Sequence, residues 1–167
     1  MTAGIKKVFQ TPLSEVSSSD KEGIGTLRFE GSKLYKYVKI LNTTATVAGV
    51  AGDIVAYGAA TGAEDNTVVL DRDDADTNPI GAGALVGTVT GTAGTAEYGW
   101  IQVKGHITLS TAVGGSAGDG DMLMAGATDK AVEKLTFTDG TPNVIKGAYI
   151  GIANDATAKK VILDCPF

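Results

Sequence analysis

The clearest strand pattern in the chain is Trp100-Ile101-Gln102-Val103-Lys104-Gly105-His106-Ile107-Thr108-Leu109. Its odd positions are apolar or small, whereas its even positions are polar apart from Trp100. This alternation predicts a β-strand with one buried and one exposed face, bent at Gly105, where a side chain is absent. Because Trp100 stands on the polar face, we expect either a loop of the same chain or a neighbouring subunit to cover it.

Further strand patterns recur along the rest of the chain, separated by turn residues. They predict strands at 24–30, 34–42, 53–57, 67–70, 84–90, 121–125, 131–135, 145–153 and 159–165. Glu30-Gly31-Ser32-Lys33 has the composition of a tight hairpin turn in which glycine supplies a positive φ. Nowhere do helix caps accompany a 3.6-residue period for more than two turns. We therefore expect an all-β fold, a compact sandwich or barrel of about 9–11 short strands.

Two stretches of the chain resemble each other. Gly52-Asp53 leads through an apolar strand and an acidic loop to a small-residue strand that closes at Gly87, and Gly120-Asp121 leads similarly to Gly151. The two Gly-Asp pairs lie 68 positions apart, and the two closing glycines lie 64 apart. This pattern suggests an internal duplication of a β unit, over about 50–91 and 118–154, with chance similarity in a Gly- and Ala-rich protein as the alternative.

Residues 1–22 differ from the rest of the chain. They are polar and rich in turn residues and show no sustained period of 2 or 3.6, so we expect an extended N-terminal arm followed by a single β domain over 23–167. The arm nevertheless carries spaced apolar residues, namely Ile5, Val8, Phe9, Leu13 and Val16. These predict docking on a partner, with Phe9 as the main anchor, whereas a freely mobile terminus is the alternative.

Composition and charge restrict the classes of partner. The formal net charge is −5 and the pI about 4.8, which argues against nucleic acid because phosphate binding requires a basic surface. The local basic cluster Lys33, Lys36 and Lys39 is interpreted as solvated strand positions, with Lys36 on the opposite face from the other two. No apolar run approaches the ~20 residues that span a bilayer, and the first ten residues lack the apolar core of a secretory signal. We expect synthesis in a cytosol and no membrane partner.

The candidate reactive groups form no recognisable catalytic unit. His106 is the single histidine and Cys165 the single cysteine, so neither a disulfide framework nor a Cys/His metal set is available. Cys165 falls among predicted core positions and is interpreted as a small buried hydrophobic residue. The pattern Asn42-Thr43-Thr44 matches a glycosylation acceptor but has no meaning without secretion. We expect no catalytic residue and no cofactor.

Two loops carry weak ligand-binding patterns. Asp74, Asp76 and Asn78 have the alternate spacing that opens a calcium loop, but Pro79 and Leu85 occupy the positions that require Gly and Glu. The prevailing interpretation is that these carboxylates cap local backbone N–H groups. The glycines of 81–87 lack the strand and helix that a dinucleotide site needs, and they indicate a turn that enters a strand. We expect no metal site.

Several segments resemble the decoration, or cement, proteins of tailed-bacteriophage capsids. They are the run of residues 25–38 (Gly-Thr-Leu-Arg-Phe-Glu-Gly-Ser-Lys-Leu-Tyr-Lys-Tyr-Val), 51–55, 84–89, the strand 98–105 with its Gly-Trp-Ile-x-Val-x-Gly pattern, and the closing 150–153. The resemblance covers most of the chain from Gly25 onward. It implies a small β-rich subunit that coats an expanded capsid as a trimer, with no catalytic residues to transfer.

The resemblance and the residues together lead to one functional hypothesis. We expect a non-enzymatic virion protein on the capsid exterior that binds the major capsid protein, bridges coat subunits and forms a homotrimer. The candidate contact residues are Ile5, Val8, Phe9, Leu13, Tyr98 and Trp100. The alternative is a receptor- or glycan-binding module of a phage fibre, in which exposed Trp100 and Tyr98 stack on sugar rings.

Overall fold

The fold is all-β, as predicted. The computed structural model describes residues 8–59, 62–75, 80–135 and 149–165. The strands are β1 (Val16–Ser17), β2 (Leu27–Glu30), β3 (Lys33–Ile40), β4 (Ile54–Tyr57), β5 (Thr67–Val69), β6 (Gly81–Leu85), β7 (Glu97–Thr108), β8 (Val113–Gly114), β9 (Met122–Ala125), β10 (Val132–Lys134), β11 (Tyr149–Asp155) and β12 (Lys160–Asp164). In the described ranges, a 3-10 turn, η1 (Arg72–Asp74), follows β5. No helix of the described ranges is long and apolar enough to cross a membrane.

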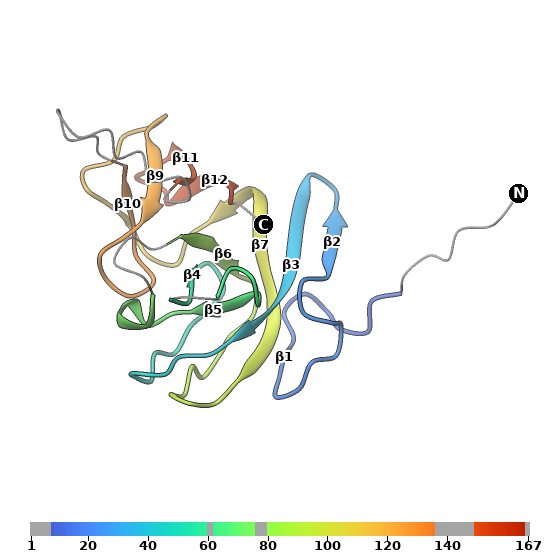
Figure 1. Cartoon of the computed structure of the whole chain (residues 1–167). Helices are drawn as coiled ribbons and strands as arrows, with labels where there is room; N and C mark the ends of the chain where they lie inside the picture. The colour runs from blue at the N-terminus through green and yellow to red at the C-terminus, as the bar shows by residue number, and fades with distance from the viewer. Residues whose placement is uncertain (1–7, 60–61, 76–79, 136–148, 166–167) are drawn as a thin grey trace, which may run out of the picture.

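Five strands close into a barrel. The order is β3-β5-β4-β6-β7, and the ring closes because β7 also pairs antiparallel with β3, from Ile40↔Glu97 to Leu34↔Lys104. In Figure 1 these strands form the centre of the molecule. Closure removes the free sheet edges that an open five-stranded sheet would present. Of the two predicted architectures, the barrel is the one observed.

The long strand β7 connects the barrel to the rest of the sheet. Its first half pairs with β3, with β1 (Val16↔Gly99) and with β6 (Ala84↔Gln102). Its second half pairs with β12, from Lys104 to Thr108. Gly105 lies between the two halves with φ +96°, and an added Cβ would lie 2.9 Å from the backbone oxygen of Ser32, so a side chain does not fit at this predicted bend.

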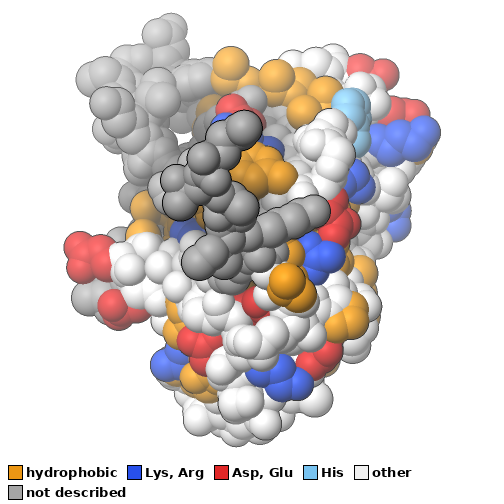
Figure 2. Space-filling model, turned by 90° about the vertical axis from the view of Figure 1, so that its right-hand side faces the viewer, with side chains coloured by type: hydrophobic (Ala, Val, Ile, Leu, Met, Phe, Trp, Pro, Cys, Tyr) orange, Lys and Arg blue, Asp and Glu red, His pale blue; other side chains and the backbone are white. Residues whose placement is uncertain are grey.

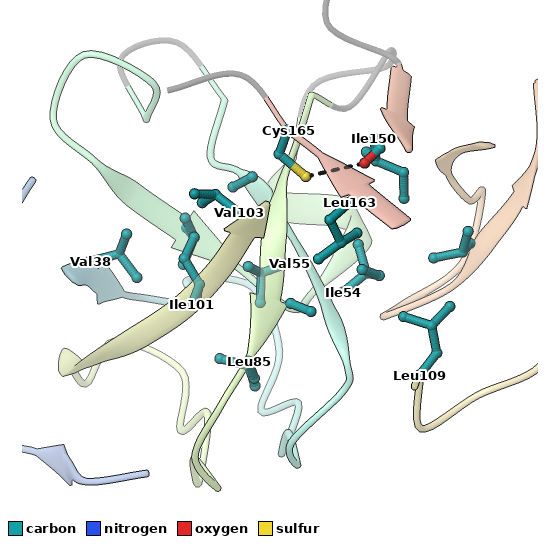
Figure 3. Packing of buried hydrophobic residues seen from close by; sticks show 14 of the residues in the cluster. Val38, Ile54, Val55, Leu85, Ile101, Val103, Leu109, Ile150, Leu163 and Cys165 are labelled. Carbon is teal, nitrogen blue, oxygen red and sulfur yellow. Dashed lines mark hydrogen bonds between the residues drawn. The ribbon is translucent and has the colours of Figure 1, made fainter. Parts of the chain in front are cut away.

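Beyond β12 the sheet continues through β11, β9, β10 and β8. We call β9, β11 and β12 the distal sheet. Its inward residues join the barrel core, so that Ile150, Leu163 and Cys165 pack in one continuous cluster with Val55 and Ile101 (Figure 3). A second, smaller cluster lies on the opposite face of β3 and β7 and contains Tyr35, Tyr37 and Trp100.

The two resembling stretches adopt the same hydrogen-bond pattern. Asp53 accepts from Val50 N–H, Gly52 donates to Leu85, and Leu85 donates back to Asp53. Asp121 accepts from Gly118 N–H, Gly120 donates to Ala153, and Ala153 donates back to Asp121. We call 50–85 the first unit and 118–153 the second unit.

The register of the two units corrects the alignment expected from the sequence. Val55 pairs with Gly83 in the first unit, and Leu123 pairs with Gly151 in the second, so that the glycine equivalent to Gly151 is Gly83 and not Gly87. The spacing is then 68 positions throughout. An added Cβ would lie 2.6 Å from the Gln102 oxygen at Gly83 and 2.2 Å from the Ile162 oxygen at Gly151, which explains why both positions lack a side chain.

The predicted strands match the observed ones with one main exception. Residues 81–83 were expected as a turn, but Gly81–Leu85 forms the fully buried strand β6, and the predicted continuation to residue 90 is not part of it. Small residues are needed here for packing, because a Cβ at Gly81 would lie 2.0 Å from Cγ2 of Ile150. The predicted residues 145–148 lie outside the described residues.

Candidate interaction surfaces

The N-terminal segment folds back onto its own barrel. Residues 9–13 cover the outward face of β3 and β7, where the Phe9 ring meets Trp100 edge to face with 5.6 Å between centroids. Trp100 meets Tyr37 in the same way at 5.1 Å. Farther along, Val16 and Ser17 pair with Gly99 and Tyr98 as strand β1. Residues 9–17 of the predicted arm therefore have partners within their own chain.

Polar contacts also hold this segment on the barrel. The carboxylate of Glu22, only 9% exposed, accepts from Gln10 N–H, Thr11 N–H and the Thr11 hydroxyl at 2.6, 2.7 and 2.8 Å. The Trp100 indole donates to Thr11 Oγ1 at 2.9 Å, and Arg28 donates to the Thr11 carbonyl at 3.0 Å. Charge-assisted hydrogen bonds of this kind are stronger than neutral ones. We call residues 9–22 the strap.

The strap covers several of the candidate contact residues. Trp100 is 1% exposed, so it is covered by its own chain and cannot stack on a sugar or a partner in this conformation. Phe9, Leu13 and Tyr98 are partly buried against the same cluster. Val8, in contrast, is 81% exposed. Ile5 lies outside the described residues.

Large exposed apolar side chains define two other surfaces. Leu27 and Phe29 of β2 are 39% and 74% exposed, and β2 is the end strand of the sheet order. Side chains alternate along β2, so these two lie on the opposite face of the strand from Arg28, whose guanidinium lies over the Phe9 ring at 4.8 Å. We call Leu27 and Phe29 the hairpin patch. On the distal sheet, Met122, Ile152 and Ile162 form a second exposed group, the distal row.

Neither surface was located from the sequence. Leu27 and Phe29 lay inside a predicted strand, and Met122, Ile152 and Ile162 lay inside three others, but strand patterns alone do not tell which face remains exposed. Alternation in 160–164, where Val161 and Leu163 are buried, was the available signal that Ile162 points outward.

The reactive groups are accounted for by the fold. Burial raises the pKa of the Cys165 thiol to about 12, with a further contribution from Asp164, and the thiol lies 3.5 Å from the Ile150 carbonyl (Figure 3). His106 is exposed on β7. Within the described ranges, no three His, Cys, Asp or Glu side chains are grouped so that they could hold a metal ion.

The acidic loop caps neighbouring backbone, as expected. Asp74 accepts hydrogen bonds from the backbone and hydroxyl groups of Thr43 and Thr44. Burial raises the pKa of Asp74, but these hydrogen bonds outweigh it and hold the pKa below its usual value. Asp76 and Asn78 lie outside the described residues. Asn42 is fully buried and donates to Val47 and Gly91, so its amide is not available for glycosylation.

Lys36 departs from the sequence interpretation. It lies on the opposite face from Lys33 and Lys39, as expected, but that face points into the barrel and Lys36 is only 5% exposed. Its ammonium donates to the Tyr57 hydroxyl at 3.0 Å. Burial lowers the pKa of Lys36, and burial followed by Cys165 raises that of Tyr57 to about 12. Lys36 is thus a structural group and not a solvated one.

Comparisons with known proteins add no relative to this picture. No family model matches the chain, and no curated protein and no solved structure matches it.

Proposed function

We propose that this chain is a non-enzymatic decoration protein that binds the exterior of an expanded phage capsid and bridges coat subunits. The observation that carries the proposal is the hairpin patch, where Leu27 and Phe29 stand exposed on the end strand β2. The resemblance of 25–38 to decoration proteins covers this same strand and the hairpin turn that follows it.

The physical basis is edge pairing combined with apolar anchors. An unpaired strand edge can extend a sheet of the coat protein, and main-chain hydrogen bonds then supply affinity while side chains supply specificity. Phe29 is the most exposed aromatic residue among the large apolar side chains of the described ranges. A ligand that binds only the expanded lattice stabilises that lattice by mass action. The net charge of −5 favours solubility at high copy number.

The structure leaves fewer residues of the N-terminal segment as candidate capsid contacts. Phe9 and Leu13 pack on the chain's own barrel, so among the described candidates of this segment Val8 is the exposed one. Trp100 is covered by its own chain and so does not support the proposed homotrimer, which rests on the resemblance and on the core's small side chains.

The test is co-sedimentation with expanded, DNA-free heads of the phage that carries the gene. Phe29→Ala should weaken binding at least about tenfold, as expected for the loss of an aromatic anchor. Val50→Ala is the matched control, because Val50 is 49% exposed but lies away from β2. Equal binding by wild type and Phe29→Ala would reject the hairpin patch, and no binding by the wild type would reject the proposed function.

A deletion that tests the N-terminus has to leave the strap intact. Removal of residues 1–22 would uncover Trp100 and Tyr37 and delete β1, so a loss of binding could reflect misfolding. Removal of 1–8 leaves the Glu22 and Trp100 contacts in place. We expect this shorter deletion to weaken capsid binding without changing the thermal unfolding temperature.

A further inference from the structure

The outer face of the distal sheet carries a continuous apolar row. Met122 lies opposite Ile152, and Ile152 lies opposite Ile162, so the three side chains are direct neighbours across β9, β11 and β12. They are 49%, 36% and 37% exposed. His106 on β7 pairs with Ile162 and ends the row. Figure 2 shows hydrophobic side chains beside the histidine at the top of the molecule.

The same face in the first unit is fully covered. By register, the residues of the first unit equivalent to Met122 and Ile152 are Ile54 and Ala84, which are 4% and 0% exposed. Beside them on β7, Gln102 takes the place of Ile162 and is 2% exposed. The inward face of the second unit covers β4 and β6. Ile150 and Ala125 lie against Gly81, and a small cavity is lined by Ile54 and Ala56 on one side and by Ala125 and Ala131 on the other.

The residues on this face differ in size between the units. In the first unit Ala56 and Ala84 permit close approach of the second unit, whereas Met124 and Ile152 occupy these positions in the second unit. Bulky apolar residues on an exposed sheet face add contact area without serving the monomer's core. The outer face of the first unit is thus an internal interface. The equivalent face of the second unit carries larger side chains and is exposed to solvent.

We propose that the distal row is the contact for a second copy of this chain, packed face to face about a twofold axis that runs along the row. In an isologous contact of this kind each residue on the axis meets its own counterpart. Ile162 would then pack on Ile162 of the partner subunit. This inference does not depend on the capsid proposal.

The charges beside the row suit this arrangement. On the outer face of β12 the order is Lys160, Ile162, Asp164, all three exposed. A twofold axis through Ile162 reverses the strand, so Lys160 of one copy lies opposite Asp164 of the partner subunit, and this pair occurs twice. Asp164 already pairs with Lys104 at 2.7 Å on the open surface, and an exposed pair of that kind leaves room for a second cation.

The first test is the assembly state of the full chain across a concentration series, by sedimentation velocity. We expect a monomer–dimer equilibrium in the wild type and a monomer in Ile162→Lys at the same concentrations. Phe29→Lys is the matched control, because it places the same charge in the hairpin patch and should leave the dimer unchanged. Circular dichroism and thermal unfolding of each variant establish that it folds.

The second test is a charge exchange. Lys160→Asp places one carboxylate opposite Asp164 of the partner subunit at each of the two symmetric places and should raise the dissociation constant about tenfold. The double variant Lys160→Asp/Asp164→Lys restores the pairs and should return it to within about threefold of the wild type.

Three outcomes would overturn the proposal. One is a monomer at every concentration, and weaker capsid binding by Ile162→Lys would then assign the row to a coat protein. Another is a trimer, which a single twofold contact cannot form. The third is a dimer that is indifferent to Lys160→Asp or is not restored by the double variant. Capsid binding by Phe29→Ala is measured separately, so failure here leaves the proposed function standing.

Discussion

The first and second units share one backbone plan but use it differently. In both, an aspartate accepts a hydrogen bond from the backbone three residues earlier, a glycine turn precedes it, and a glycine lies where the returning strand meets its neighbour too closely for a side chain. The outer face of the first unit is core, whereas that of the second is surface. The backbone pattern therefore determines the shape of a unit, and side-chain size determines which of its faces another unit can cover.

The largest difference in unfolding free energy should come from substitutions at equivalent positions on the outer faces of the two units. Ile54 is 4% exposed and Met122 is 49% exposed. Ile54→Ala should lower the free energy of unfolding by about 2–4 kcal/mol, because it empties a packed site. Met122→Ala should change it by less than about 0.5 kcal/mol, as for an ordinary surface substitution. Urea unfolding at low protein concentration, where the chain is monomeric, gives both values.

Similar losses in the two variants would mean that the second unit's face is also packed in the monomer. The comparison between the units would then fail, and the distal row would lose its basis as a bare surface.

A second contrast concerns the close approach at Gly81. Gly81→Ala places a methyl group on Cγ2 of Ile150 and should cost about 1–3 kcal/mol through overpacking. Ile150→Ala removes that methyl partner, so the double variant Gly81→Ala/Ile150→Ala should be more stable than the sum of the two single effects by about 0.5–3 kcal/mol. Thermal and urea unfolding of the four proteins complete the cycle. Additive losses would show that Gly81 is not what lets the units meet.

The smallest difference in stability loss is expected between substitutions of the two turn aspartates, Asp53 and Asp121. Asp53 is 2% exposed and accepts from Val50 N–H and Ser110, with the Lys130 ammonium 3.8 Å away. Asp53→Ala should cost about 1–3 kcal/mol, because it leaves a buried donor unsatisfied. Asp121 is on the surface, so Asp121→Ala should cost less. An equal or larger loss for Asp121→Ala would contradict the difference in burial between the units.

The stabilisation by Asp121 should also depend on pH. Its hydrogen bond to Lys134, then that to Gly118 N–H, lowers the pKa of Asp121. A carboxyl with a lowered folded-state pKa stabilises the fold above its unfolded pKa, near 3.9, and this contribution disappears as the pH falls through the folded value. The gap in melting temperature between wild type and Asp121→Ala should therefore shrink between about pH 5 and pH 2. A gap that does not change with pH would exclude an ionic contribution.

Much of the sheet could be predicted from the sequence, because alternation and turn residues are local signals. The hairpin at Gly31 has the expected positive φ of +59°, and the strands around Ile101, Leu123 and Leu163 were located to within a few residues. Barrel closure was one of two predicted architectures and could not be chosen, because the pairing of β3 with β7 joins residues 57 or more positions apart.

The misjudged residues share a physical cause. Trp100 and Gln102 follow an outward pattern, yet both are buried. The strap, roughly ninety positions earlier, covers Trp100, and the Gln102 amide donates to the Lys104 and His106 carbonyls. The strap has no sustained period, since outside the two residues of β1 it is held by aromatic contacts and by the Glu22 carboxylate. Lys36 was assigned to solvent because lysine is rarely buried, and Tyr57 was not identifiable as its partner from 21 positions away. What covers a face is decided by distant residues.

The placement of β7 has a mechanical consequence. This one strand is bonded to β1 and β3 near its start and to β12 near its end. A pull between the strap and the distal sheet would therefore run lengthwise along β7. Antiparallel hydrogen bonds lie perpendicular to the strands, so such a load shears many of them at once instead of opening them one by one. The molecule is built to resist tension along this line more strongly than across it.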